Sequence, residues 1–241
     1  VMDNTRFNHY PHCLINVINP LKEWLPMARK TKAEAQRTRQ LLIEAAIEQF
    51  AARGGAYTTL TDIADAANLT RGAIYWHFSS KAEIFNAIWQ EQCPLREIIN
   101  DQLSKVTERD PLFNLREQFV TALQYIARDH RQRALLQILY HKCEFEQGMV
   151  SEYEIRKRIG FNDENVRQIL QNCIAAGSIS AQINIDTTLI VFHGFFCGLI
   201  KNWLMKPERL DLYQQAPALV DNILSTLLAA PVPGRFYDAA S

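Results

Sequence analysis

The chain is poor in glycine, carries no net charge and contains none of the short motifs that mark common enzymes. Only nine of its 241 residues are glycine, and 26 basic side chains balance 26 acidic ones. We find no G-x-S-x-G, phosphate-binding loop or H-E-x-x-H sequence, which argues against an enzyme. The balanced charge argues against a generally basic architectural protein, so positive charge that meets nucleic acid must be local.

Cysteines at metal-binding spacing are absent too. The five cysteines are scattered and odd in number: Cys13, Cys93, Cys143, Cys173 and Cys197. This usage favours reduced thiols, and we expect a cytoplasmic protein. His141 and His193 each stand near a cysteine in the sequence, but no further pair completes a ligand set. We therefore expect core packing for these side chains, with no metal and no cofactor.

Strand-like alternation is also scarce, and apolar residues recur at spacings of three and four, so the sequence predicts an all-α fold. With 48% hydrophobic residues, a chain of this length can bury a sizeable core. Outside the segment 59–79, helices are expected at 33–52, 80–92, 95–106, 111–128, 132–144, 149–176 with a break near Gly160, 186–205 and 214–229. The first should bury Leu41, Leu42, Ala45, Ala46, Gln49 and Phe50.

The expected domain organisation is a small domain at 27–80, a larger helical domain at 81–230 and a flexible tail at 231–241. Residues 1–26 contain only a short apolar stretch, so they are neither a convincing signal peptide nor a membrane span. We interpret them as a disordered or artificial extension, with Met27 as the working initiator.

The most apolar segment is Leu189–Leu204. It is short for a membrane span and is interrupted by His193, Lys201 and Asn202, so we expect no membrane contact. Gly194 and Gly198 would give this helix a flat strip that another helix can approach closely. With a later apolar face (Leu219, Ile223 and Leu227), it predicts a four-helix homodimer interface. The alternative is packing within one chain.

The segment Thr59 to Lys81 carries the strongest functional signal. Thr59, followed by Asp62, is typical of a capped helix start, and Asn68 tolerates the left-handed backbone of a tight turn. Thr70 then caps a second helix whose inward side is Ile74 and Phe78. A capping box at Ser80–Glu83 begins another helix. Two short helices joined by such a turn form the unit that sets its second helix in the DNA major groove.

The side chains left on the outside of the second helix suit DNA. Arg71 can pair two donors with a guanine, and Gly72 permits close backbone approach. Tyr75, His77 and Lys81 can reach phosphates. The alternative is an ordinary helical hairpin whose aromatic residues pack against a neighbour.

On these residues the chain resembles the TetR family of bacterial repressors. The resemblance is carried by TRQLLIEAAIEQFAARGG and TLTDIADAANLTRGAIYWHFSSKAEIF. ILYHKCEF and NWL further along are similar to the AcrR and AcrS branch, whose members repress multidrug efflux pumps. The resemblance implies operator contacts at Thr59, Thr61, Thr70, Arg71, Gly72, Tyr75, Trp76, His77 and Lys81. The loop Arg53–Tyr57 departs from the family, because its second glycine replaces a small apolar residue.

The same resemblance implies a ligand site among the middle helices. Aromatic residues there could line an apolar pocket for a small-molecule inducer: Trp89, Phe113, Phe119 and Tyr153. The helix that starts at Lys81 would transmit ligand binding to the DNA-reading unit. The predicted function is repression of a multidrug efflux operon through a palindromic double-stranded operator. The alternative is a regulator, either a repressor or an activator, of a metabolic operon that answers to a metabolite.

A run of basic residues lies at 29–39, before the helix-turn-helix segment. Five basic residues, Arg29, Lys30, Lys32, Arg37 and Arg39, face one acid, Glu34. Such a run can follow phosphates or enter the minor groove. A solvated first helical turn is the alternative.

Overall fold

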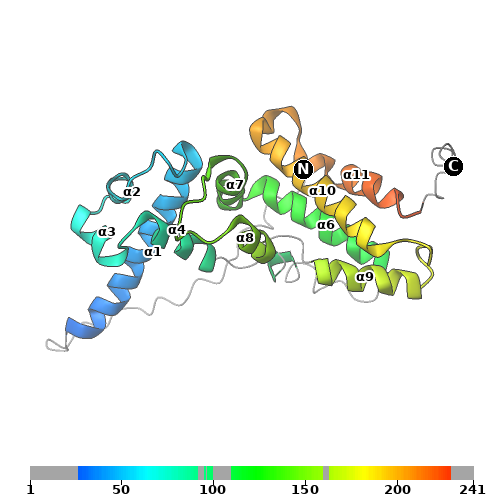
Figure 1. Ribbon diagram of the computed structural model, residues 1–241, viewed down its shortest axis with the longest axis horizontal. Helices are drawn as coiled ribbons and strands as arrows, with labels where there is room; N and C mark the ends of the chain where they lie inside the picture. The colour runs from blue at the N-terminus through cyan, green and yellow to red at the C-terminus, as the bar shows by residue number, and fades with distance from the viewer. Residues whose placement is uncertain (1–26, 92–94, 96, 100–109, 160–162, 229–241) are drawn as a thin grey trace, which may run out of the picture. The chain divides into compact units, whose positions relative to one another are not determined.

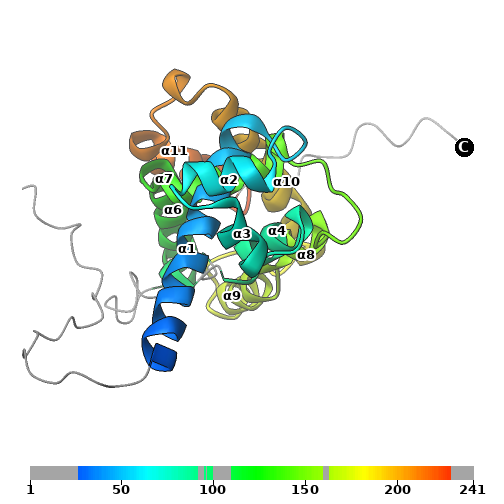
Figure 2. The same cartoon turned by 90° about the vertical axis from the view of Figure 1, so that its left-hand side faces the viewer.

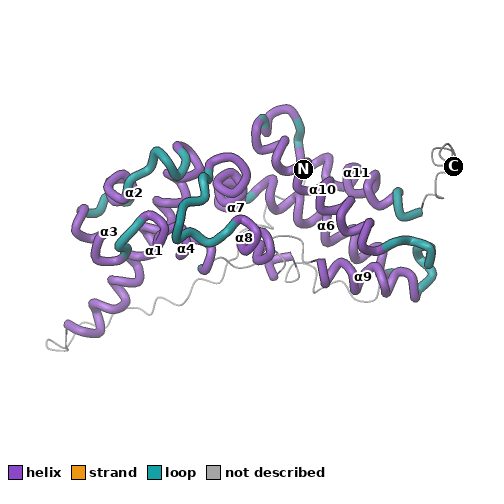
Figure 3. The backbone as a smooth tube through the Cα atoms, viewed as in Figure 1, coloured by secondary structure: helices purple, strands orange, loops and turns teal. Residues whose placement is uncertain are grey.

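The computed structural model describes residues 27–91, 95, 97–99, 110–159 and 163–228, and every regular element in them is a helix (Figures 1 and 3). The expected all-α fold is confirmed. The proposed extension at 1–26 and the tail at 231–241 lie outside the described residues. The chain divides into a short unit that ends at Arg37 and a large unit from Thr38 onward, which contains the helix-turn-helix segment and the helices that follow it.

The first half of the described chain contains α1 (Met27–Arg53), α2 (Leu60–Ala66), α3 (Arg71–His77) and α4 (Lys81–Gln90). Ile43 and Ile47 of α1 are buried, whereas Leu41 is 48% exposed, so the expected burial of Leu41 was wrong. The buried residues of α1 are 42, 43, 45, 46, 47 and 50, and residue 41 points away from this stripe; Gln49, which was also expected to be buried, is half-buried. Figure 2 shows α2 and α3 side by side, as their mutual contacts require.

The second half contains α6 (Pro111–Arg128), α7 (His130–Gln137), the π-helix η1 (Ile138–Lys142), α8 (Glu152–Ile159), α9 (Asp163–Ala175), α10 (Ile185–Met205), η2 (Pro207–Arg209) and α11 (Leu212–Ser225). Helix α6 packs against α9 and α11 (Figure 1). Its bounds match the prediction, because Asp110 caps it and Pro111 occupies its first turn. Arg116 of α6 holds Asp221 of α11 with two hydrogen bonds of 2.6 and 3.0 Å.

Several predicted boundaries differ from the structure. Asp129 caps α7, which therefore begins two residues before the expected Gln132. The expected helix at 132–144 ends in η1, whose Tyr140 and His141 contact α10 through Cys197 and the carbonyl of Lys201. The helix expected at 149–176 with a break near Gly160 corresponds to α8 and α9, which lie on either side of that break; α8 begins three residues later than expected. Of the expected helix at 95–106, only residues 95 and 97–99 are described, and they are helical.

Helix α10 has the composition of a membrane-spanning segment. Among the described helices, it is the one that is long and apolar enough to cross a membrane, with a mean hydropathy of 1.4 over its most apolar stretch. Of that stretch, 33% is buried within the chain. Phe192 and Phe196 pack against Phe119 of α6, with ring centroids 5.6 and 4.5 Å away. One side of α10 thus belongs to the core, while Ile190 and Val191 lie exposed on the other side.

Candidate nucleic-acid interface

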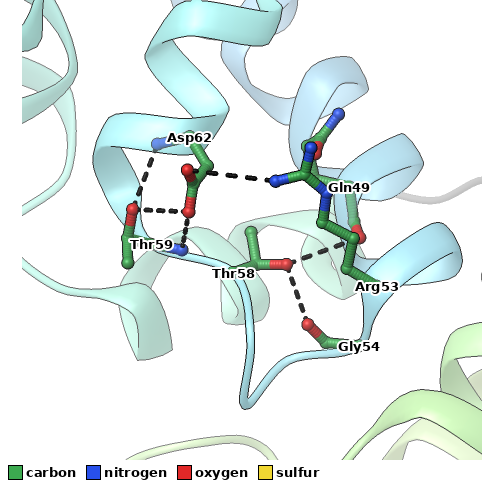
Figure 4. Close-up of polar contacts among 6 residues, drawn as sticks. All are labelled: Gln49, Arg53, Gly54, Thr58, Thr59 and Asp62. Carbon is green, nitrogen blue, oxygen red and sulfur yellow. Dashed lines mark hydrogen bonds and ion pairs between the residues drawn. The ribbon is translucent and has the colours of Figure 1, made fainter.

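Helix α2 begins at a closed capping box (Figure 4). The Thr59 hydroxyl accepts from the Asp62 amide at 3.1 Å and donates to the Asp62 carboxylate at 2.7 Å. The Thr59 amide donates to that same carboxylate at 2.8 Å. The Thr59 hydroxyl and amide hold the pKa of Asp62 below its ordinary value of 3.8, because they stabilise the charged carboxylate. The predicted helix start is confirmed.

The turn between α2 and α3 has the predicted geometry. Asn68 has φ of 54°, the left-handed conformation that asparagine tolerates, and it is the residue other than glycine with this backbone among those described. The Leu69 amide then donates to the Ala64 carbonyl at 2.9 Å, and its side chain packs against the core. Both contacts fix the angle at which α3 leaves α2.

Helix α3 turns one side inward and presents the other to solvent. The Thr70 hydroxyl accepts from the Ala73 amide at 3.2 Å and caps the helix. Ile74 and Phe78 are buried, as predicted, whereas Tyr75 is 48% and Trp76 is 73% exposed. The aromatic residues of α3 therefore do not pack into a neighbouring helix of the described chain, as an ordinary hairpin would require.

Gly72 lies on the exposed side of α3 with open space around it. A Cβ atom added there would meet only the Thr70 hydroxyl, at 3.9 Å. The backbone of the folded chain therefore does not require glycine at this position. A glycine in a helix costs stability relative to alanine, and the described packing around Gly72 does not offset this cost.

Arg71 and the threonines differ in their freedom to meet DNA. The Arg71 guanidinium lies 5.5 Å from the Tyr75 ring centroid, an exposed cation–π arrangement. The Thr70 hydroxyl uses only its acceptor side in the cap, so its proton is available to a phosphate. The Thr59 hydroxyl both accepts and donates within its capping box. Thr61 is half-buried.

His77 closes α3 and is partly shielded. Its ring lies 4.5 Å from that of Trp76 in a T-shaped arrangement. Burial lowers the pKa of His77 below its ordinary value of 6.5, and the positive charge of Arg39 lowers it further. Arg39 itself pairs with Glu91 and lies 5.0 Å from the Phe78 ring centroid. Both effects disfavour the charged form of the His77 ring in the free protein.

The start of α4 differs from the predicted capping box. Ser80 accepts from the Glu83 amide at 3.2 Å, but the Glu83 carboxylate binds the amide and hydroxyl of Ser79, each at 2.7 Å. These Ser79 hydrogen bonds lower the pKa of Glu83. The predicted partner was wrong by one residue, because the carboxylate reaches back one position further than in a capping box.

Lys81, the expected phosphate contact, is already engaged within the protein. Its ammonium donates to the Gly55 carbonyl at 2.8 Å and to the Glu146 carboxylate at 3.0 Å. Glu146 belongs to the loop Cys143–Ser151, which follows η1 and which we call the 143–151 loop. No local sequence pattern indicates this partner, since 65 residues separate the two side chains.

The 143–151 loop is tied to α4 by one further residue that sequence reasoning missed. Asn86 donates from its side-chain amide to the Gly148 carbonyl at 2.8 Å and accepts from the Val150 amide at 2.7 Å. Just before the loop, the Lys142 carbonyl accepts from the Gly55 amide at 2.9 Å. The unusual second glycine of the 53–57 loop therefore has a docking contact.

The proposed ligand-site residues are not gathered in one place. Trp89 and Phe119 are buried, Phe113 is half-buried, and Tyr153 is 71% exposed and thus lines no apolar pocket in this conformation. The Trp89 indole nitrogen is buried without a hydrogen-bond partner among the described residues. A narrow cavity, lined by Phe119, Asp163, Val166, Leu189, Phe192, His193 and Phe196, adjoins the aromatic cluster of α6 and α10.

The proposed dimer residues also divide. Ile223 and Leu227 are buried within the chain, so the alternative of packing in one chain accounts for them. Gly194 is exposed, and a Cβ added at Gly194 or Gly198 would meet no atom within 4 Å. Gly198 also borders a groove at the end of α10, with Phe195, Leu199, Asn202, Trp203, Met205, Lys206, Arg209 and Leu210.

The three cysteines described are free thiols. Burial raises the pKa of Cys143 and that of Cys173 to about 11. Cys197 lies 3.5 Å from the His193 ring nitrogen. In the described residues, no group of three potential metal-binding side chains comes together.

A capped helix-turn-helix whose second helix turns arginine, glycine and aromatic residues to solvent defines a sequence-reading DNA-binding protein. Residues 42–88 match the family model described as "Bacterial regulatory proteins, tetR family", and residues 110–229 match "MAATS-type transcriptional repressor, C-terminal region". The chain belongs to the TetR family and is a DNA-binding transcriptional repressor.

Individual relatives cover most of the chain. The probable acrEF/envCD operon repressor of Escherichia coli K12 is 53% identical over 198 residues, which are 82% of this chain and 90% of the relative. AcrR of Shigella flexneri is 36% identical over 207 residues, 85% of this chain and 96% of the relative. The crystal structure of NalD, the secondary repressor of the MexAB-OprM multidrug efflux pump in Pseudomonas aeruginosa, has a TM-score of 0.65 and 28% identity, covering 80% of this chain and 98% of NalD.

Proposed function

We propose that this repressor controls a multidrug efflux pump operon and is released from its operator by small lipophilic or cationic compounds. The similarity to the acrEF/envCD operon repressor and to NalD supports the pump as the regulated target. The observation that carries the DNA-binding part is the exposed side of α3, where Tyr75, Trp76 and the open space at Gly72 face solvent. Such a protein works in the cytoplasm, where the chromosome lies.

The nine candidate contacts divide by chemistry. Arg71 reads a guanine edge, and Gly72 lets the backbone of α3 approach the bases. Trp76 makes apolar contact with base edges or sugars, and Tyr75 and Thr70 donate hydroxyl protons to phosphates. The remaining contacts flank this centre and bind the phosphate backbone of the DNA: Thr59, Thr61, His77 and Lys81.

We propose that two chains assemble through the exposed side of α10. One α3 reads only a few base pairs, so a selective site needs two copies, about one DNA helical turn apart. Ile190, Val191 and Met205 are exposed apolar residues on the side of α10 that includes Gly194. A second copy covers such a face at lower cost than a membrane does, because His193, Lys201 and Asn202 interrupt the apolar run of the helix with polar side chains. Sedimentation should show a dimer at micromolar concentration.

For the inducer, Trp89 is the strongest candidate contact. Its buried indole N–H has no hydrogen-bond partner among the residues that the structure describes, which costs free energy that a ligand acceptor would recover. Trp89 lies in the last turn of α4, the helix that begins at Lys81 beside the DNA-reading unit. An inducer that binds Trp89 in only one arrangement of α4 shifts the balance between DNA-binding and released states.

Selection from random DNA tests the proposed target. The purified protein is used to select duplexes from a random library, and the selected sequence is then located in the genome. We expect a near-palindrome beside a pump operon, and release of the protein from it by a planar lipophilic cation. Selected sites that lie only beside lipid or catabolic genes would contradict efflux control and support the metabolic alternative.

A further inference from the structure

The Glu146 carboxylate binds the Lys81 ammonium and would compete there with a DNA phosphate. The Lys81 side chain is 22% exposed, and its nitrogen lies 3.0 Å from the Glu146 carboxylate. The Glu146 side chain is 50% exposed and forms no other hydrogen bond that the described contacts include. Glu146 thus offers Lys81 the same ligand that a phosphate would offer, a negatively charged oxygen.

The site around this ion pair is open to a phosphate. A polar groove lies beside it, lined by Ser79, Ser80, Lys81, Asn86, Glu146 and Gly148. The Lys81 ammonium has three protons, of which the Gly55 carbonyl takes one and Glu146 another. A phosphate on the remaining proton would stand close to the Glu146 carboxylate, and the two negative charges would repel.

The position of Glu146 is fixed by the backbone of its loop. The two hydrogen bonds of Asn86 hold Gly148 and Val150 against α4. Gly148 has φ of 90°, a conformation that favours glycine, and this turn lies two residues after Glu146. The Phe145 ring meets Phe85 edge to face at 6.0 Å. The carboxylate is therefore held at Lys81 by its neighbours on both sides.

We propose that Glu146 occupies the place of an operator phosphate on Lys81 and thereby lowers the affinity of this repressor for DNA. The proposal rests on the proposed contact of Lys81 with phosphate. Binding to DNA exchanges one anionic partner of Lys81 for another or places both against it, and either event reduces the net gain. Glu146 is thus an affinity-determining residue that does not itself touch DNA.

The test compares glutamine variants, which remove the charge and keep the shape. Glu146→Gln should bind both the selected duplex and random DNA about two- to fivefold more tightly, the range expected for an exposed ion pair. Both duplexes should respond alike, because phosphates carry no sequence information. Glu144→Gln is the matched control, since it makes the same charge change on an exposed residue of the same loop. It should bind as the parent protein does.

Two further variants distinguish the role of Glu146 from the proposed contact of Lys81 with phosphate. Lys81→Gln should weaken binding to both duplexes, and Lys81→Gln with Glu146→Gln should bind no better than Lys81→Gln alone. If Lys81→Gln has no effect, the proposed phosphate contact is wrong. If Lys81→Gln weakens binding while Glu146→Gln equals Glu144→Gln or binds less tightly, the role of Glu146 is overturned. Circular dichroism confirms folding, and Glu146→Ala repeats the measurement with a second side chain.

Discussion

At the scale of single residues, replacing Gly72 should affect folding stability and DNA binding in opposite directions. Gly72→Ala should raise the free energy of unfolding by about 0.5–1 kcal/mol, because alanine is the better helix former and the space beside it is open. The same methyl group would stand between the α3 backbone and the bases and should weaken operator binding by about tenfold. Chemical denaturation and fluorescence anisotropy measure the two effects. A stabilised variant with unchanged affinity would remove Gly72 from the interface.

His77 should make operator binding depend on pH. Its pKa lies below 6.5 in the free protein, and a nearby phosphate raises it, so binding takes up a proton. The affinity for the operator should therefore rise about threefold as pH falls from 7.5 to 6. Ordinary Asp and Glu side chains titrate below this pH range and would not produce the same rise. In His77→Gln the rise should disappear. Equal pH profiles would show that His77 meets no phosphate.

The lowered pKa of His77 makes the folding stability of the free protein fall with acid, whereas DNA binding strengthens. A lowered pKa in the folded state means that the unfolded chain binds more protons below pH 6.5. The stability that neutral His77 contributes is present above pH 6.5 and is lost as pH falls through the lowered pKa. DNA binding and folding thus respond to acid in opposite directions at this residue.

At the scale of elements, the capping box should govern the stability of α2. Thr59→Ala should cost about 1 kcal/mol of unfolding free energy at pH 7, a typical loss for a helix cap. Because the pKa of Asp62 is lowered in the fold, its contribution is present above pH 3.8 and is lost as pH falls through the lowered value. The difference between parent and variant should shrink over that range in thermal melts. Thr61→Ala is the control, and an equal loss there would contradict the assignment.

Sequence patterns anticipated local elements better than long-range contacts. The starts of α2, α3 and α6 were predictable, because each helix is capped by a side chain three residues from the amide it accepts. The turn at Asn68 followed from the backbone preference of asparagine. By contrast, Asn86 and Glu146 reach partners more than 60 residues away, and no local pattern reports such pairs. The exposure of Leu41 shows a helix stripe misplaced by one position.

At the scale of the whole molecule, dimer assembly explains where sequence reasoning stopped. Ile223 and Leu227 have the apolar periodicity of an interface, but that pattern cannot distinguish a partner from the chain's own core. The structure assigns both to the core and leaves Ile190 and Val191 of α10 exposed. A dimer through α10 would place two copies of α3 on one near-palindromic operator, so each α3 substitution acts twice per complex.

The central claim is that α3 reads operator sequence, and Arg71→Ala tests it most directly. Binding of this variant to the selected duplex and to random DNA is measured at the same salt concentration. We expect a loss of about 1–3 kcal/mol for each half-site on the selected duplex and little loss on random DNA. Arg209→Ala, the same charge change on η2, should alter neither. An equal loss on both duplexes would contradict base reading by α3.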